Sequence, residues 1–185
     1  MNLTAANQLT ILRMLLIPAF VILLMYGYRG WALVTFFAAG ITDLLDGLIA
    51  RWTGQKTKLG AWLDPMADKL LLVTMFVMLT LPDIGSANRL PLWFTVLVIS
   101  RDVAIVLTVA VVNLAVGPRT FKPSIFGKIA TATYIMTGVV TLYFNYLGRK
   151  TSVVSLFVYG SLAITLVSAF HYLLQVLRIG QAADR

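Results

Sequence analysis

The sequence predicts an all-α membrane protein with six transmembrane helices. The chain has 185 residues, of which 59% are hydrophobic and only 12% are charged, about half the charged fraction usual in a soluble domain. Its apolar residues gather in runs that are long enough, or nearly so, to cross a bilayer core of about 30 Å as helices. This composition excludes a cytosolic globular protein and a disordered chain, and the lack of Cys excludes a disulfide scaffold and a cysteine-ligated metal scaffold. The six predicted spans are residues 12–28, 31–50, 61–81, 92–116, 129–146 and 153–177.

These spans use most of the chain, so residues 1–185 are expected to form one domain without a separate soluble part. Ahead of the first span, residues 1–11 are mildly amphipathic, which is typical of a short helix lying on the membrane surface. We interpret the first span as a retained helix and not as a signal peptide. No basic leader precedes Arg13, and no convincing small-residue cleavage site precedes Tyr26.

The basic residues predict the orientation of the helices. The loops and termini on the side of the N-terminus carry nine Lys and Arg residues, whereas the loops on the other side carry four. By the positive-inside rule, the richer side and both termini face the cytoplasm. The net charge of +8 does not indicate a nucleic-acid partner, because the basic residues are dispersed between long apolar runs and form no stripe on one face.

The acidic residues are concentrated around one loop. All seven acids are Asp, and four of them flank the loop of residues 51–60 between the second and third spans. A carboxylate costs about 2.5 to 3.5 kcal/mol at the centre of a membrane helix, so these positions point to function. Because the loop is short, we expect the two pairs of acids to face each other. At helical spacing, one face carries Asp43, Asp46, Gly47 and Ala50, and one face of the next helix carries Asp64 and Asp68.

Four carboxylates at one interface repel one another, and divalent cations can compensate their charge. Ligation by Asp oxygens suits a hard ion such as Mg²⁺, Mn²⁺ or Ca²⁺, and with no Cys and only His171 the chain offers no zinc site. Two ions about 4 Å apart would balance four charges and could clamp a pyrophosphate. Salt bridges between these carboxylates and nearby cations are the simpler alternative. Such salt bridges would not explain why the acids stand at helical spacing or why glycines accompany them. Those cations are Arg51, Lys56, Lys58 and Lys69.

The acidic segment carries a resemblance to a known family. It reads Asp43-Leu-Leu-Asp46-Gly47-Leu-Ile-Ala50-Arg51, then eight residues, then Gly60-Ala-Trp-Leu-Asp64-Pro-Met-Ala-Asp68. This segment, here named the carboxylate motif, resembles the signature of the CDP-alcohol phosphotransferases, D-x-x-D-G-x-x-A-R, eight or nine residues, G-x-x-x-D-x-x-x-D. Every fixed position is matched. Asn7-Gln-Leu9-Thr10-Ile-Leu-Arg13, here named the N-terminal motif, is similar to the N-x-L-T-x-x-R stretch of the same family.

The resemblance implies six transmembrane helices around a polar cavity open to the cytoplasm, and a homodimer in the bacterial inner membrane. It implies transfer of the phosphatidyl group from CDP-diacylglycerol to an alcohol, with release of CMP and with two divalent cations, Mg²⁺ or Mn²⁺, as cofactors. By the same resemblance Asp68 is a metal ligand and the general base, and Arg51 meets the nucleotide pyrophosphate. The other implied roles are metal binding by Asp43, Asp46 and Asp64, and space for the CDP group at Gly47, Ala50 and Gly60.

The acceptor alcohol is predicted from the fourth and fifth spans. Glycerol 3-phosphate is a dianion that needs clustered basic groups. The related phosphatidylglycerolphosphate synthases carry basic residues at two positions where this chain has Val109 and Ala130. The segment around Arg101 is closer to cardiolipin synthases of the CDP-alcohol type, so we favour phosphatidylglycerol, with glycerol 3-phosphate as the alternative. The single charge of phosphatidylglycerol would meet Arg101, Lys122 and Lys128.

These three basic residues also have simpler interpretations. Arg101 could form an ion pair with Asp102 that only offsets charge, and the two lysines could be ordinary positive-inside loop residues. A cation transporter is the alternative from another class, since intramembrane Asp residues also line ion paths. A transporter predicts acids spread through the membrane depth, often in repeated halves, whereas here they gather at one loop beside Gly and Arg.

Overall fold

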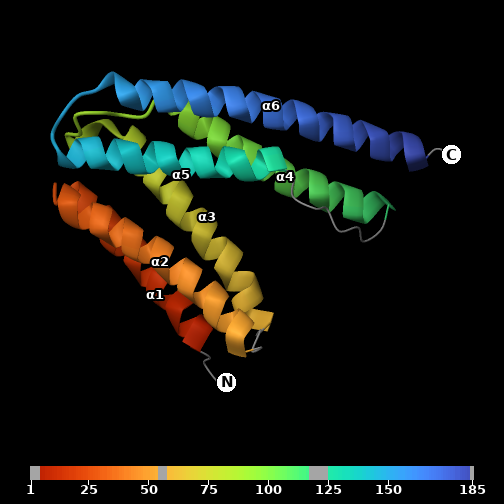
Figure 1. Cartoon of the computed structure of the whole chain (residues 1–185), viewed down its shortest axis with the longest axis horizontal. Coiled ribbons are helices and arrows are strands. Elements are labelled where there is room, and N and C mark those ends of the chain that lie inside the picture. Colours follow the sequence, from red (N-terminus) through yellow and green to blue (C-terminus); the bar gives the residue numbers. More distant parts are fainter. Residues whose placement is uncertain (1–4, 54–57, 117–124, 184–185) are drawn as a thin grey trace. The chain divides into compact units, whose positions relative to one another are not determined.

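The structure, a computed structural model, describes residues 5–53, 58–116 and 125–183. Over these ranges the chain forms six α-helices and one short 3-10 turn, with no β-strand, which confirms the predicted all-α class (Figure 1). The elements are α1 (Ala5–Met25), α2 (Arg29–Thr53), α3 (Lys58–Thr80), η1 (Pro82–Ile84), α4 (Leu92–Val116), α5 (Ile125–Tyr146) and α6 (Ser152–Ala183).

Each predicted span falls largely within one helix. Judged by length and composition, the described residues contain three helices that could cross a membrane, Gln8–Met25, Ile125–Tyr146 and Ser152–Phe170. This finding indicates a membrane protein. Residues 5–11, for which a surface helix is expected, are helical and continue without a break into the rest of α1, and residues 1–4 lie outside the described residues.

The chain divides into two compact units. Unit 1 consists of Met1–Arg89 and Thr141–Lys150, and unit 2 consists of Leu90–Val140 and Thr151–Arg185. Unit 1 therefore holds α1, α2, α3 and the last residues of α5. Unit 2 holds α4, most of α5, and α6.

In unit 1, α1 and α2 lie side by side and run antiparallel, joined by a tight turn (Figure 1). Gly27 stands in this turn with φ +79°, a conformation that a residue with a Cβ rarely adopts. Its N–H donates to the carbonyl of Leu24 at 3.0 Å, and the N–H of Tyr28 donates to the carbonyl of Leu23 at 2.8 Å. These two bonds satisfy carbonyls at the end of α1, so the helix stops there and the chain reverses.

Apolar side chains fill the seam between α1 and α2. Phe20 and Leu24 of α1 are buried, and so are Ala32, Phe36 and Ala39 of α2. The rings of Phe20 and Phe36 lie 5.9 Å apart, between centroids. Ala32 and Ala39 are one heptad apart, and small residues at this spacing let two membrane helices pack closely. The buried stripe of α2 therefore follows the spacing i, i+4, i+7.

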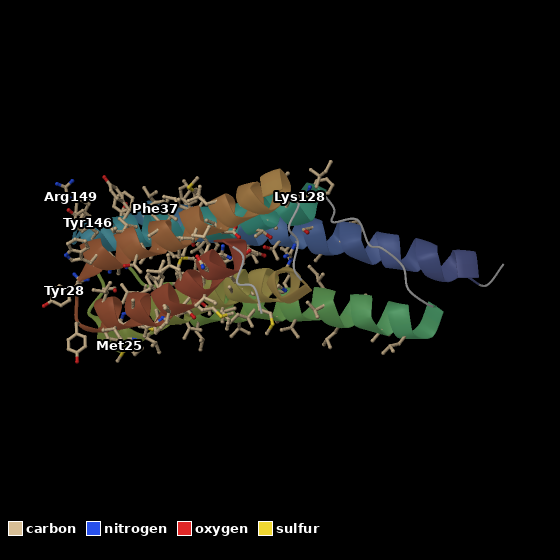
Figure 2. All side chains as sticks on the ribbon, turned by 90° about the horizontal axis from the view of Figure 1, so that it is seen from below. Met25, Tyr28, Phe37, Lys128, Tyr146 and Arg149 are labelled. Atoms are coloured by element: carbon tan, nitrogen blue, oxygen red, sulfur yellow. The ribbon has the colours of Figure 1, made fainter. Side chains whose placement is uncertain are left out.

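Exposed aromatic side chains mark the end of unit 1 that holds the α1–α2 turn. Tyr26, Tyr28, Trp31 and Tyr146 are all exposed. Figure 2 shows Tyr28 and Tyr146 at this same end, together with Met25. Tyr and Trp are enriched at membrane–water interfaces, so this end of unit 1 is suited to lie at one surface of the bilayer.

The connection between α3 and α4 is fastened to the end of α5. The backbone N–H of Asn88 donates to Oδ1 of Asn145 at 2.7 Å, and Nδ2 of Asn145 donates to the carbonyl of Asn88 at 3.0 Å. Nδ2 of Asn88 also donates to the carbonyl of Arg149 at 2.7 Å. Both Asn side chains are buried. A second bond, from Nη2 of Arg29 to the carbonyl of Gly85 at 2.6 Å, ties the start of α2 to the same connection.

We expect Asn145→Ala to lower the free energy of unfolding by about 2 kcal/mol, because it leaves buried backbone groups of Asn88 without their partner. Thermal unfolding in detergent measures the loss. Tyr143→Phe is the control, since it removes only a hydroxyl group from an exposed side chain of the same helix. Equal melting temperatures for the two variants would contradict this account of the connection.

Unit 2 is held together by aromatic contacts and by hydroxyl pairs between helices. Phe94 of α4 meets the ring of Tyr134 of α5 edge to face, with centroids 6.2 Å apart. The hydroxyl of Tyr134 lies 2.5 Å from Oγ1 of Thr165 in α6, and Oγ1 of Thr137 lies 2.8 Å from Oγ of Ser161. These polar groups are buried, so each pair satisfies hydroxyls that lipid could not hydrate.

Candidate active site

Two carboxylates of the carboxylate motif meet the same arginine. Nη1 of Arg13 in α1 donates to Oδ1 of Asp68 in α3 at 2.6 Å and lies 3.2 Å from Oδ1 of Asp43 in α2. Asp43 comes from the first half of the motif and Asp68 from the second half. The structure thus brings the two halves together, as the sequence predicts, and it does so around a cation of the N-terminal motif.

Helix register explains why these three residues meet. Arg13 precedes Gly27 by 14 residues and Asp43 follows it by 16, so at 1.5 Å per residue they lie about 21 Å and about 24 Å from the turn. Asp43 also lies on the same face of α2 as the buried stripe, since it stands four residues after Ala39. Asp68 lies 12 residues before the end of α3 at Thr80, or about 18 Å. All three helices therefore present their charged residue at a similar level.

The two carboxylates are partly open, whereas the arginine is enclosed. The side chains of Asp43 and Asp68 are 41% and 42% exposed, and that of Arg13 is 0% exposed. Arg13 therefore holds the carboxylates from the interior, and the exposed part of each remains accessible. Partly exposed Asp oxygens from two helices are the kind of donor that Mg²⁺ and Mn²⁺ prefer.

Several predicted site residues lie outside the described part of the structure. Among the described side chains, no three potential metal ligands of the His, Cys, Asp and Glu type gather. Asp46 and Asp64, which the sequence assigns to the same site, are not in that set, so the predicted four-carboxylate cluster is untested. The other predicted positions whose side chains are outside it are Gly47, Ala50, Arg51 and Gly60, and Lys122 is outside it altogether.

Arg101 is held within unit 2 by its neighbours. Its Nη1 donates to Oδ1 of Asp102 at 2.8 Å, and its guanidinium carbon lies 6.0 Å from the ring centroid of Tyr134. Its Nη2 lies 3.5 Å from the carbonyl of Gly127, and its side chain is 14% exposed. The Arg101–Asp102 ion pair that the sequence suggests is therefore present, and it offsets the charge of Arg101.

Lys128 stands in the first turn of α5, in the same unit as Arg101. Its side chain is exposed, and Figure 2 labels it near the start of α5. The first turn of α5 also supplies the carbonyl of Gly127 that lies near Arg101. Lys128 and Arg101 thus belong to one neighbourhood, in which Lys128 is open and Arg101 is mostly enclosed.

A comparison with protein families gives one match over nearly the whole chain. The model of the family described as CDP-alcohol phosphatidyltransferase matches residues 3–174. The chain belongs to the CDP-alcohol phosphatidyltransferase family. The family predicted from the two motifs is confirmed, and the chain is therefore an enzyme, a transferase, and not a cation transporter.

Relatives in the CDP-alcohol phosphatidyltransferase family carry two kinds of name. A probable phosphatidylglycerophosphate synthase of Mycobacterium tuberculosis is 32% identical over 183 residues, which cover 94% of this chain and 81% of the relative. The CMP-forming cardiolipin synthase of Homo sapiens is 35% identical over 162 residues, which cover 77% of this chain and 52% of the relative. A putative cardiolipin synthase of M. tuberculosis is 34% identical over 144 residues, 76% of this chain and 64% of the relative. These names place the chain in phospholipid biosynthesis.

The sequence prediction gives Arg13 no role in the site, although the residue belongs to the N-terminal motif. It counts Arg13 only as a basic residue near the cytoplasmic end of the first span. One signal could have found it, because Arg13 is the only charged residue of α1. A permanent charge in such a helix needs a partner, and the nearest acids in sequence are those of the carboxylate motif.

Proposed function

We propose that the protein transfers the phosphatidyl group from CDP-diacylglycerol to phosphatidylglycerol, forming cardiolipin and CMP. The observation that carries the proposal is the meeting of Asp43 and Asp68, one from each half of the carboxylate motif, with part of each side chain exposed. Family membership supplies the class of reaction. The partly exposed carboxylates of Asp43 and Asp68 offer a place where a divalent cation could bind and meet the phosphates of the donor.

Divalent metal is part of the proposal, and the donor set supports it. Asp43 and Asp68 offer oxygen ligands on two helices, and in the proposal Asp46 and Asp64 complete the set for two ions, Mg²⁺ or Mn²⁺. When bound, the ions would neutralise the pyrophosphate and stabilise the departing CMP. Asp83 and Asp184 are far from the motif in sequence and have no place in this set.

The residues of the chain then have distinct tasks in the transfer. Asp68 takes the proton of the acceptor hydroxyl as its oxygen attacks the β-phosphorus of the donor. A new phosphorus–oxygen bond forms, the bond from that phosphorus to the bridging oxygen breaks, and CMP leaves with the electron pair. Arg51 meets the pyrophosphate, while Gly47, Ala50 and Gly60 leave space for the CDP group.

The enzyme is proposed to work at the cytoplasmic side of the membrane. The site lies about 20 Å from the aromatic end of unit 1, so in a hydrocarbon core of about 30 Å it would approach the opposite interface. Basic loop residues adjoin the carboxylate motif, which favours the cytoplasm for that interface. The full proposal is one domain of six transmembrane helices over residues 1–185, with a polar cavity open to the cytoplasm, as a homodimer in the bacterial inner membrane.

Phosphatidylglycerol is favoured as the acceptor because the described side chains around Arg101 leave little uncompensated positive charge. The ion pair with Asp102 offsets Arg101, which leaves Lys128 as an exposed cation among the described side chains beside it, and in the proposal Lys122 assists. This suits a phosphodiester with one negative charge better than a phosphate dianion. Glycerol 3-phosphate is the second candidate, supported by the relative named phosphatidylglycerophosphate synthase, which aligns with 94% of this chain.

Purified protein in mixed micelles tests the proposal directly. Labelled CDP-diacylglycerol is supplied with Mg²⁺ or Mn²⁺ and either phosphatidylglycerol or glycerol 3-phosphate, and the lipid product and CMP are measured. We expect labelled cardiolipin and stoichiometric CMP with phosphatidylglycerol. Product with glycerol 3-phosphate alone would replace the proposed acceptor with the second candidate, and no CMP with either would refute the proposed transfer.

The role of Arg101 can be tested by its effect on one substrate. We expect Arg101→Gln to raise the KM for the lipid acceptor about tenfold, since one charge-assisted hydrogen bond is worth about 1.4 kcal/mol or more, and to leave the KM for CDP-diacylglycerol unchanged. Lys150→Gln, at an exposed lysine of the α5–α6 turn, is the control. A lower melting temperature with both KM values unchanged would mean that Arg101 serves only the ion pair with Asp102.

A further inference from the structure

Arg13 is a buried charge that the proposed transfer does not by itself require. Its side chain is 0% exposed, it lies in a helix without any other charged residue, and it contacts a carboxylate on each of two other helices. A guanidinium stays protonated at any working pH, so this charge is permanent. Burying it is costly unless acidic partners compensate it.

We propose that Arg13 is a positioning residue and a fixed counter-cation of the active site, which adds to the positive charge that the metal-loaded site offers to the anionic donor. This inference rests on the proposed function. Four motif carboxylates and two divalent ions cancel each other's charge. Arg13 adds a positive charge to that of Arg51, so the loaded site attracts the pyrophosphate of CDP-diacylglycerol more strongly than Arg51 alone would.

The packing of α1 shows that Arg13 is held in place by more than its ion pairs. Thr10, Arg13, Phe20 and Leu24 are all buried and follow one stripe of α1 at heptad spacing. The closing turn at Gly27 and the Phe20–Phe36 contact fix that stripe against α2. Arg13 therefore stays on the interior side of Asp43 and Asp68, which leaves their exposed side for metal and substrate.

The same geometry predicts opposite effects on the two ligands of the site. A fixed cation beside Asp43 and Asp68 repels divalent metal and attracts the donor's pyrophosphate. It also shields the two carboxylates from each other before metal arrives. Removing the positive charge should therefore strengthen metal binding and weaken nucleotide binding. A residue that merely joined three helices would weaken both together as the fold loosened.

Three measurements on purified protein test the inference: Mn²⁺ affinity by calorimetry, CDP affinity at saturating Mn²⁺, and melting temperature. For Arg13→Gln, which keeps hydrogen-bonding capacity without charge, we expect the Kd for Mn²⁺ to fall at least about tenfold and the Kd for CDP to rise at least about tenfold. Arg13→Lys keeps the charge, so we expect both Kd values to stay within about threefold of the parent.

The possible results separate this inference from the function on which it rests. Weaker binding of both Mn²⁺ and CDP in Arg13→Gln, with a lower melting temperature, would overturn the inference and leave Arg13 as a structural link. Unchanged affinities in Arg13→Gln would overturn it too, while CMP release by the parent protein would leave the proposed function intact. If Arg13→Gln does not fold, Arg13→Lys provides the test, because it keeps the charge. A rise of about tenfold in the Kd for CDP in the folded Arg13→Lys variant would contradict the inference. A parent protein that neither binds Mn²⁺ nor releases CMP would instead refute the proposed function.

Discussion

Asp68→Asn should reduce kcat about 10³-fold while CDP binding remains within a few-fold of the parent. The amide cannot accept the proton of the acceptor hydroxyl at neutral pH, so the step that creates the nucleophile loses its base. Its carbonyl oxygen can still accept the hydrogen bond from Arg13, so the contact between α1 and α3 is conserved. Initial rates of CMP release and calorimetry with CDP measure the two effects.

The control for Asp68→Asn is Asp83→Asn, which changes an acid of η1 outside the carboxylate motif. It should leave kcat and CDP affinity at the parent values. A turnover of Asp68→Asn equal to that of the parent would remove the base role. Loss of CDP affinity and turnover together would reassign Asp68 to a purely ligand-holding role.

Hydropathy predicts where the helices lie better than where they end. The fourth predicted span, residues 92–116, coincides with α4. By contrast, the first predicted span begins at residue 12 although α1 begins at Ala5, because its first turns contain polar residues that lower hydropathy without breaking a helix. The same span overshoots the end of α1 at Met25, where the decisive signal is the turn conformation of Gly27 and not apolarity.

The sequence predicts the contacts of the site that follow from the spacing of residues along the chain. It does not predict the contacts that depend on how one helix is rotated about its axis. The helical spacing of the motif acids and the short loop between them suffice to predict that Asp43 and Asp68 meet. Nothing in α1 indicates which way Arg13 points, since most of the helix is apolar on every side. Its orientation follows from packing of Phe20 and Leu24 against α2, which only the folded structure shows. The pairing of Arg101 with Asp102 could not be assumed either, because adjacent residues on a helix rarely face each other.

Removal of divalent metal should abolish turnover without unfolding the protein. Metal compensation of the pyrophosphate is worth several kcal/mol in the transition state, and about 4 kcal/mol corresponds to a fall in rate of about 10³-fold. We therefore expect CMP release in excess EDTA to drop at least that far. Addition of Mg²⁺ or Mn²⁺ beyond the chelator should restore it.

The fold should survive chelation because Arg13 already bridges Asp43 and Asp68. The free energy of unfolding should fall only by the binding energy of the lost ions, about 2.7 kcal/mol for each ion at a hundredfold excess of metal over its Kd. Asp43→Asn is the matched variant, since it removes one ligand charge and should need about tenfold more Mg²⁺ for half-maximal rate. Full turnover in EDTA would exclude the metal from the reaction. Irreversible unfolding in EDTA would show that the metals, and not Arg13, hold the carboxylates together.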